Sequence, residues 1–126
     1  MFYPKDNMIY DELWDIVPAA LVTKGEAAQL EDVLGFYYFD SLEIGDEVTF
    51  IYRQRQVESD KATGTGEDIN AGQRLYYYPA NDNVSPNRVG VMGVDYMFCG
   101  WAKKDAAAAA TKVLMNFDGT RYDQIA

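Results

Sequence analysis

Hydrophobic and polar residues alternate along several short stretches of the chain, with the period of two that is typical of β-strands. The clearest run is residues 48–57. One face of that run is expected to carry Val48, Phe50 and Tyr52, and the other Thr49, Ile51, Arg53 and Arg55. Further strands are predicted over residues 36–39, 73–78, 91–102 and 112–117. The pattern predicts a mainly β fold, a small antiparallel barrel or sandwich with long connections.

Turn-forming residues separate these strands. Residues 41–46 and 81–90 are rich in Asp, Asn, Ser and Gly, so we expect loops there. Gly93 and Gly100 interrupt the predicted strand 91–102 and indicate bulges or close backbone approaches. The alanine run 106–110 could form one helical turn, but its place between two strands favours a hairpin connection.

Residues 23–35 carry two conflicting signals. Thr23 and Glu26 fit a helical capping box, and Gly35 could end a helix there. The alternative, two short strands with a turn at Glu31 and Asp32, is implied by the family resemblance described at the end of this section. We favour the strands, because tertiary context often overrides local helix propensity.

The first 20 residues form a distinct segment, which we expect to be an N-terminal arm preceding a β domain of residues 21–126. Asn7 could cap a short helix that runs to about Asp15, and an extended arm is the alternative. The segment contains the large side chains Phe2, Tyr3, Met8, Tyr10 and Trp14. We expect these five to dock outside their own domain, on a neighbouring copy or another protein. The alternative is that the segment folds back on its own core.

Tyr76, Tyr77 and Tyr78 are consecutive, so alternation places Tyr76 and Tyr78 on the face opposite to Tyr77. One face is expected to enter the core. The other face is predicted to be an interface, because tyrosine combines a large apolar area with a hydrogen-bonding group. Stacking of carbohydrate on these rings is the second interpretation.

The amino-acid composition limits which catalytic and metal-binding sites the chain can form. The 126 residues contain no histidine, so a Ser-His-Asp or Cys-His catalytic arrangement cannot form within the chain. The single cysteine, Cys99, cannot form an internal disulfide and is expected to be a small buried residue. We therefore expect a protein that is not an enzyme and that has no cofactor and no metal site.

Charge is distributed unevenly. The net charge is −9, and all of it lies in residues 1–60, since residues 61–126 contain seven acidic and seven basic side chains. A chain of this charge with no basic cluster is not expected to bind nucleic acid. No apolar run is long enough to predict a membrane-spanning helix, and no secretion signal is evident.

A set of glycine-punctuated strands makes the sequence similar to a known family. The pattern consists of Ala62-Thr-Gly-Thr-Gly-Glu67, Ala71-Gly-Gln-Arg-Leu-Tyr76, Val89-Gly-Val-Met-Gly-Val94, Gly100-Trp-Ala102 and Val113-Leu-Met-Asn-Phe-Asp-Gly119. It resembles the capsid cement, or decoration, proteins of tailed phages. The similarity covers roughly residues 22–119 and rests on glycines and strands rather than on reactive groups.

The resemblance implies a structural function. Such proteins are small β domains that bind the outside of an assembled phage head, contact the major capsid protein and stabilise the shell. By this resemblance we expect a virion protein made in the host cytoplasm and located on the outer capsid surface. We also expect a homo-oligomer, with a trimer favoured and a dimer possible. A head-associated receptor- or carbohydrate-binding module is the alternative.

Overall fold

The computed structural model of the protein describes residues 1–4 and 12–121. Its regular elements are β1 (Phe2–Pro4), β2 (Glu12–Ile16), β3 (Ala27–Leu30), β4 (Val33–Tyr37), β5 (Val48–Asp60), β6 (Arg74–Tyr78), β7 (Asn83–Ser85), β8 (Met97–Ala102), β9 (Lys112–Asp118) and the 3₁₀ turn η2 (Gly119–Arg121). The strands form one sheet in the order β3-β4-β5-β9-β8-β6-β7, and β1 and β2 also pair with β5. This antiparallel sheet is strongly curled into a half-barrel, which confirms the predicted mainly β fold.

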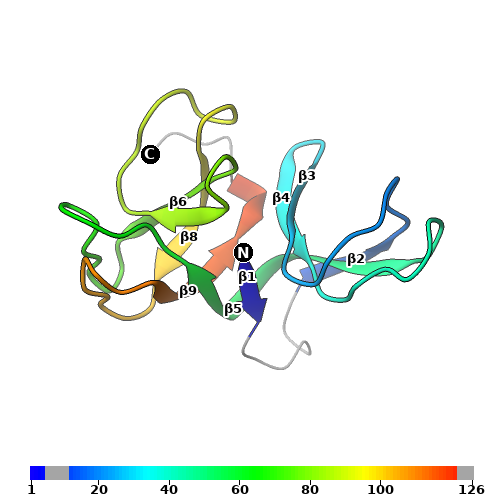
Figure 1. The fold of residues 1–126 in the computed structure, drawn as a ribbon, viewed down its shortest axis with the longest axis horizontal. Coiled ribbons are helices and arrows are strands. Elements are labelled where there is room, and N and C mark those ends of the chain that lie inside the picture. Colours follow the sequence, from blue (N-terminus) through cyan, green and yellow to red (C-terminus); the bar gives the residue numbers. More distant parts are fainter. Residues whose placement is uncertain (5–11, 122–126) are drawn as a thin grey trace.

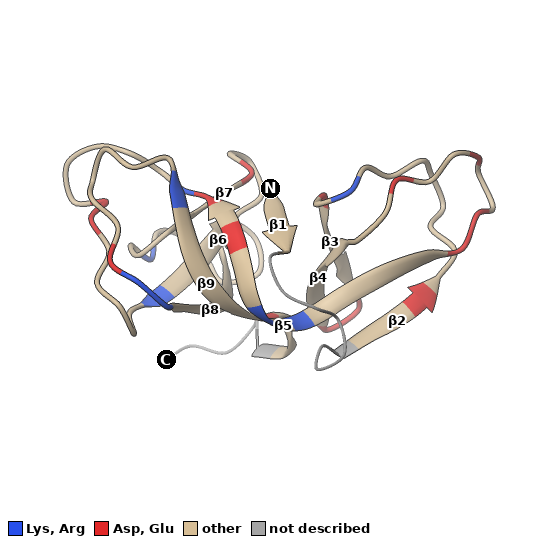
Figure 2. Ribbon diagram, turned by 90° about the horizontal axis from the view of Figure 1, so that it is seen from below, with Lys and Arg blue, Asp and Glu red and all other residues tan. Residues whose placement is uncertain are grey.

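The long strand β5 connects the two halves of the molecule (Figure 1). Its first half lies between β4 and β2, and its second half lies between β9 and β1. Figure 2 shows it as a curved strand that joins a lobe containing β2, β3 and β4 to a lobe containing β6, β7, β8 and β9. We call these the β2–β4 lobe and the β6–β9 lobe.

Two register shifts allow β5 to pair with strands of both lobes. Ile51 and Arg53 face consecutive residues of β2, and a second shift separates Gln54 from Val57 in the pairing with β9. Irregularities of this kind bend a strand and increase its twist. They also make the predicted alternation wrong beyond Ile51, because Ile51 is buried in the core whereas Arg53 and Arg55 are exposed.

The main core lies on one face of the curled sheet, which we call the inner face. Its buried members come from every strand except β2 and β3, and include Phe2, Leu34, Phe36, Ile51, Val57, Leu75, Val84, Cys99, Met115 and Phe117. Two smaller clusters pack on the outer face. One surrounds Tyr37, Val48 and Phe50, and the other surrounds Tyr76, Tyr96 and Phe98. Burial on both faces explains why neighbouring residues in one strand are often both buried.

The structure resolves the conflict over residues 23–35 in favour of two strands. β3 and β4 pair through a turn at Glu31 and Asp32, as predicted, and Glu31 takes a positive φ of 52°. The capping-box contact does form, since the Thr23 amide donates to the Glu26 carboxylate at 3.3 Å. It closes a turn and not a helix, because the chain beyond it pairs with β4.

Two other predictions need correction. The strand predicted over residues 91–102 begins only at Met97, because the Asp95 carboxylate accepts a hydrogen bond from the Val91 amide and closes a turn. The loop predicted over 81–90 contains the short strand β7. Gly100, in contrast, is a close-approach point as predicted, since a Cβ atom there would overlap the Asn116 carbonyl oxygen.

The first 20 residues are partly built into the sheet. Phe2, Tyr3 and Pro4 pair with Ser59, Glu58 and Val57 of β5, and residues 12–16 pair with its first half. Of the two alternatives for this segment, the short helix from Asn7 to about Asp15 is therefore wrong for its last part, which is strand β2. Its first part lies outside the described residues.

Candidate functional site

Two of the predicted interface residues are buried in their own domain. Phe2 has an exposed fraction of 0%, and its ring lies 5.4 Å, 5.3 Å and 4.9 Å from the rings of Phe36, Tyr77 and Phe117. Tyr76 is 8% exposed and packs edge-on against Tyr96 and Phe98. The expectation that Phe2 docks outside its own domain is wrong, because β1 folds back on the core. Tyr76 is likewise too enclosed to form a contact surface.

The other predicted residues differ in their surroundings. Tyr3 is half-buried, with the Lys112 ammonium 4.2 Å from its ring centre. Tyr78 is half-buried, and its hydroxyl donates a hydrogen bond to the Asn87 carbonyl. Trp14 is 43% exposed and stacks beside Phe50 and Tyr52 on the outer face. Met8 and Tyr10 lie outside the described residues. Of the described candidates, Trp14 has the greatest exposed apolar area.

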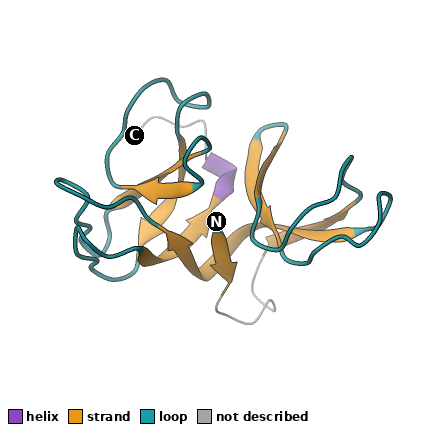
Figure 3. Cartoon of the chain, in the orientation of Figure 1, coloured by secondary structure: helices purple, strands orange, loops and turns teal. Residues whose placement is uncertain are grey.

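The strongest candidate surface lies at the end of the β2–β4 lobe. Large apolar side chains project there from the β2–β3 and β4–β5 loops, drawn teal in Figure 3. We call this surface the apolar tip; it consists of Val17, Leu21, Phe39, Leu42 and Ile44. Leu42 is 85% exposed and Ile44 is 74% exposed. Large exposed apolar side chains gathered on neighbouring loops make this part of the molecule a candidate interaction surface.

Hydrogen bonds fix the two loops of the apolar tip to each other. The Val22 amide donates to the Ser41 hydroxyl at 2.7 Å, and the Ser41 amide donates to the Val22 carbonyl at 3.0 Å. Within the second loop, the amides of Leu42 and Glu43 both donate to the Asp46 carboxylate, at 2.9 Å and 2.8 Å. The exposed side chains are therefore held on an ordered backbone, which reduces the entropy lost on binding.

The apolar tip lies in the most acidic part of the chain. Residues 12–47 contain nine acidic side chains and one lysine. Asp40, Glu43 and Asp46 lie within the β4–β5 loop itself. Figure 2 shows several acidic positions in red along the loops of this lobe. A partner surface with an apolar centre and a basic rim would match this surface in both hydrophobicity and charge.

A second exposed apolar surface lies on the β6–β9 lobe. The loop before β8 exposes Val89, Val91 and Val94, which we call the valine loop. Hydrogen bonds from the Val91 amide to the Asp95 carboxylate and from the Gly93 amide to the Tyr96 carbonyl hold it in place. Figure 1 shows this loop and the apolar tip in opposite halves of the elongated molecule.

A cavity of about 480 Å³ lies beside the valine loop. Its lining includes Glu67, Tyr78, Asn81, Asn83, Ser85 and Asp95. The Ser85 hydroxyl donates to the Glu67 carboxylate at 2.6 Å. The amide oxygen of Asn83 is buried without a hydrogen-bond partner in the structure. The cavity combines apolar walls, which include Val89 and Val94, with these amide, hydroxyl and carboxylate groups, as small-molecule sites commonly do.

Burial and ion pairs shift the pKa values of Asp60, Cys99 and Lys61 away from their ordinary values. Partial burial raises the pKa of Asp60, but pairing with the ammonium groups of Lys112 and of the N-terminus outweighs it, so the pKa lies below its ordinary value. Burial raises the pKa of the Cys99 thiol, which makes the sulfur unreactive at neutral pH. Burial also lowers the pKa of Lys61, whose ammonium donates to the carbonyls of Ala62, Ala108 and Ala110.

The described residues do not bring together a metal site or a membrane-spanning helix. Among residues 1–4 and 12–121, no group of three His, Cys, Asp or Glu side chains could hold a metal ion. Within the same part of the chain, no helix is long and apolar enough to cross a bilayer.

Sequence reasoning did not identify the apolar tip. Residues 41–46 were interpreted only as a turn, yet a turn that contains Leu42 and Ile44 is unusually apolar. The apolar side chains at these turn positions were the feature of the sequence that could have identified this surface.

No family model, curated protein or solved structure matches the chain.

Proposed function

We propose that the protein is a capsid decoration protein. It binds the outer surface of an assembled tailed-phage head, contacts the major capsid protein there and strengthens the shell. It is made in the host cytoplasm and acts as a homo-oligomer, with a trimer favoured and a dimer possible. The proposal combines the resemblance to cement proteins in residues 22–119 with the distribution of exposed apolar groups.

The observation that carries the proposal is the presence of two exposed apolar surfaces on opposite lobes of one sheet. A protein that clamps neighbouring subunits needs two docking surfaces held at a fixed separation. The apolar tip and the valine loop meet this requirement, because the continuous strand β5 connects their lobes. Repetition of a modest contact over many copies then gives a large total stabilisation.

The negative charge of the β2–β4 lobe indicates which kind of capsid surface it would bind. With nine acidic residues and one lysine in residues 12–47, this lobe favours a capsid surface with basic residues around an apolar depression. Binding through the apolar tip should therefore weaken as salt concentration rises, because exposed charge pairs are screened.

Cosedimentation with purified heads that lack the protein tests this proposal. We compare the wild type with the double variants Leu42→Ser/Ile44→Ser and Val91→Ser/Val94→Ser. Removing two exposed apolar anchors should cost about 2 kcal/mol of binding, roughly thirtyfold in Kd. Leu114→Ser is the matched control, since Leu114 is a half-buried leucine of β9 outside both surfaces.

Comparison of the two double variants shows whether the apolar tip and the valine loop each contribute to binding. Loss of binding in both double variants, with the control unchanged, supports docking at both ends. Unchanged binding in both double variants contradicts the proposal. The melting temperature of each double variant should stay close to that of the wild type, because the replaced side chains are mostly exposed.

The cavity beside Tyr78 favours a second candidate function, carbohydrate binding by a head-associated module. Its amide and carboxylate groups resemble the hydrogen-bonding sets that hold sugars, and Tyr78 supplies an aromatic wall. Screening against a glycan array, with Asn81→Ala as the cavity variant, tests it. A sugar that binds the wild type and not the variant would support this function, and an array without hits would argue against it.

A further inference from the structure

Several hydrogen-bond donors that line the cavity beside the valine loop are already used within the protein. The Tyr78 hydroxyl donates to the Asn87 carbonyl. The Ser85 hydroxyl donates to the Glu67 carboxylate at 2.6 Å. The side-chain amide of Asn87 donates to the Gly66 carbonyl at 2.8 Å. Because these hydrogens already have acceptors, we expect a ligand to bind through the acceptor groups of the cavity instead.

The acceptor groups of the same cavity keep unused capacity. In the part of the chain that the structure describes, the Glu67 carboxylate accepts one hydrogen bond, from Ser85. The Asp95 carboxylate likewise accepts one, from the Val91 amide at 2.9 Å. A carboxylate can accept about four hydrogen bonds, so both groups can bind further donors. Asn83 also lines the cavity, and its buried amide oxygen has no hydrogen-bond partner in the described structure. The cavity therefore favours a ligand with several donors.

The charged groups around the cavity favour a cation. Glu67 and Asp95 line it, whereas no lysine or arginine does so among the described residues. The Lys61 ammonium interacts electrostatically with Glu67 and Asp68, but it is buried and donates to three backbone carbonyls. Arg88 is exposed and does not line the cavity. A cationic ligand would therefore meet two carboxylates in this cavity and no competing cation from the described chain.

The walls of the cavity suit a long side chain that ends in a flat cation. Val89 and Val94 supply apolar surface, and Tyr78 supplies an aromatic ring. Cations are attracted to the faces of aromatic rings. The guanidinium group of arginine lies flat on such rings, and its five donors match the geometry of carboxylates. The volume of about 480 Å³ lies within the range of about 300–1,000 Å³ that is typical of small-molecule sites.

Both carboxylates are held in position before a ligand binds. Asp95 closes the turn of the valine loop through the Val91 amide and packs against Gly90. A Cβ atom at Gly90 would lie 2.3 Å from Oδ2 of Asp95, so glycine is required for this close approach. The hydrogen bond from Ser85 likewise orients the Glu67 side chain. Acceptors that are already in place reduce the entropy lost on binding.

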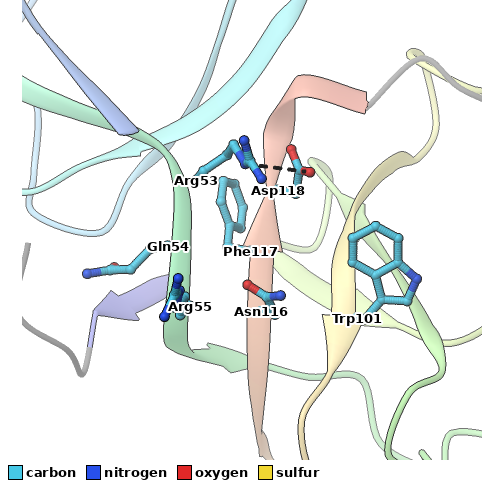
Figure 4. A pocket seen from close by; sticks show the side chains of 7 residues that line it. All are labelled: Arg53, Gln54, Arg55, Trp101, Asn116, Phe117 and Asp118. Carbon is cyan, nitrogen blue, oxygen red and sulfur yellow. Dashed lines mark ion pairs between the residues drawn. The ribbon is translucent and has the colours of Figure 1, made fainter. Parts of the chain in front are cut away.

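A second cavity, of about 280 Å³, has the opposite character. Figure 4 shows Arg53, Arg55 and Asn116 at this cavity. Arg53 forms an ion pair of 3.8 Å with Asp118 there. Two guanidinium groups already line the cavity, so it is unsuited to a further cation. Of these two cavities, only the one beside the valine loop suits a cationic ligand.

We infer that the cavity beside the valine loop binds an arginine side chain of a partner protein. The guanidinium group lies against the Tyr78 ring and donates hydrogen bonds to the carboxylates of Glu67 and Asp95, while its methylene groups pack on the valines. The identity of the partner rests on the proposed decoration function, under which the arginine belongs to the major capsid protein. A sugar fits less well, because its hydroxyl oxygens also require donors, most of which are used within the protein.

NMR titration of the full chain labelled with ¹⁵N tests the inference. The probe is acetyl-arginine-methylamide, and the control is acetyl-citrulline-methylamide, which has a side chain of similar shape without charge. We expect saturable shifts of the amide signals of Val89, Gly90 and Val94 at roughly millimolar probe, since exposed charge pairs are individually weak. Binding should weaken at about 0.5 M salt. The citrulline compound should bind about tenfold more weakly.

Isosteric variants localise the site. Glu67→Gln and Asp95→Asn should each weaken binding of the arginine probe about fivefold, since each removes one charge pair and keeps an acceptor oxygen. Asp40→Asn is the matched control. Asp40 also accepts a hydrogen bond from a backbone amide, that of Lys24 at 2.6 Å, but it lies in the β4–β5 loop of the other lobe. This control should bind the probe like the wild type.

Four results would overturn the inference. They are equal binding of the arginine and citrulline compounds, unchanged binding in both cavity variants, an equal loss in Asp40→Asn, and no saturable shift at about 20 mM probe. Tighter binding of methyl glucoside than of the arginine probe would also overturn it, in favour of carbohydrate. If Asp95→Asn disturbs the valine loop, Glu67→Gln and the citrulline comparison still decide.

Cosedimentation with phage heads tests the identity of the partner. The double variant Glu67→Gln/Asp95→Asn should bind heads less than the wild type does. Equal binding of the two proteins would overturn the assignment of the arginine to the capsid. A wild type that does not bind heads would contradict the proposed function, whereas the arginine titration tests the cavity in either case.

Discussion

The replacement Phe2→Ala tests whether the N-terminal strand is an integral part of the domain. Phe2 is fully buried and contacts three aromatic rings of the main core, from β4, β6 and β9. Its amide donates to the Gly25 carbonyl at 3.1 Å, and β1 pairs with β5. Removal of the ring would leave a cavity at the meeting point of both lobes, since Phe36 and Phe117 are fixed by their own strands.

The expected loss is large. Truncation of a fully buried phenylalanine costs about 3–5 kcal/mol, against a total stability of about 5–15 kcal/mol for an ordinary domain. With a urea m-value of about 2 kcal/mol/M, a loss of about 4 kcal/mol lowers the midpoint of unfolding by about 2 M. Trp14→Ala is the comparison, because Trp14 is also an N-terminal aromatic residue but is 43% exposed. It should cost about 1 kcal/mol.

Urea unfolding followed by circular dichroism gives both values. The m-value of Phe2→Ala should match that of the wild type if only stability changes. A loss below about 1 kcal/mol would refute the reasoning. It would mean that β1 leaves the core in solution and that Phe2 is available to a partner, as the sequence had led us to expect.

Three further outcomes follow from the described contacts. Gly100→Ala should lower stability by about 2–3 kcal/mol in chemical denaturation, because its Cβ would overlap the Asn116 carbonyl, whereas Gly72→Ala, at positive φ but in open space, should cost about 1 kcal/mol. The lowered pKa of Asp60 stabilises the fold above its unfolded-state pKa of about 4, and this stability is lost as pH falls through the lower folded-state pKa; melting temperatures from pH 6 to pH 2.5 should therefore fall less steeply in Asp60→Asn. Cys99 should react with a thiol reagent only at the rate of unfolding, and fast labelling of the native protein would contradict its burial.

The strands with regular alternation could be predicted from the sequence. Residues 48–57 and 112–117 carry enough β-branched and aromatic residues to identify β5 and β9. The turn at Glu31 and Asp32 was expected from the family resemblance, whereas local propensity favoured a helix there. The extent of β8 was not, because a hydrogen bond between Asp95 and Val91 closes a turn within an apolar run. Periodicity alone contains no information about such a contact.

Interface residues were harder to predict than strands. Large aromatic side chains in residues 1–20 indicated an exposed arm, but Phe2 is buried because β1 pairs with the distant second half of β5. Hydrophobicity does not distinguish a side chain that enters the core from one that binds a partner. The sequence pattern also gave no sign that Arg55, Trp101 and Asn116 line one cavity, because they are up to 61 positions apart along the chain and meet only through strand order.

The stability of phage heads with and without the protein tests the proposed function most directly. Heads lacking the protein are incubated with the wild type or with the Leu42→Ser/Ile44→Ser variant, and DNA release is then followed during heating and after osmotic shock. The account predicts that heads with the wild-type protein survive to higher temperature and larger osmotic shock, and that the variant gives little protection. Equal survival of decorated and bare heads would contradict the account.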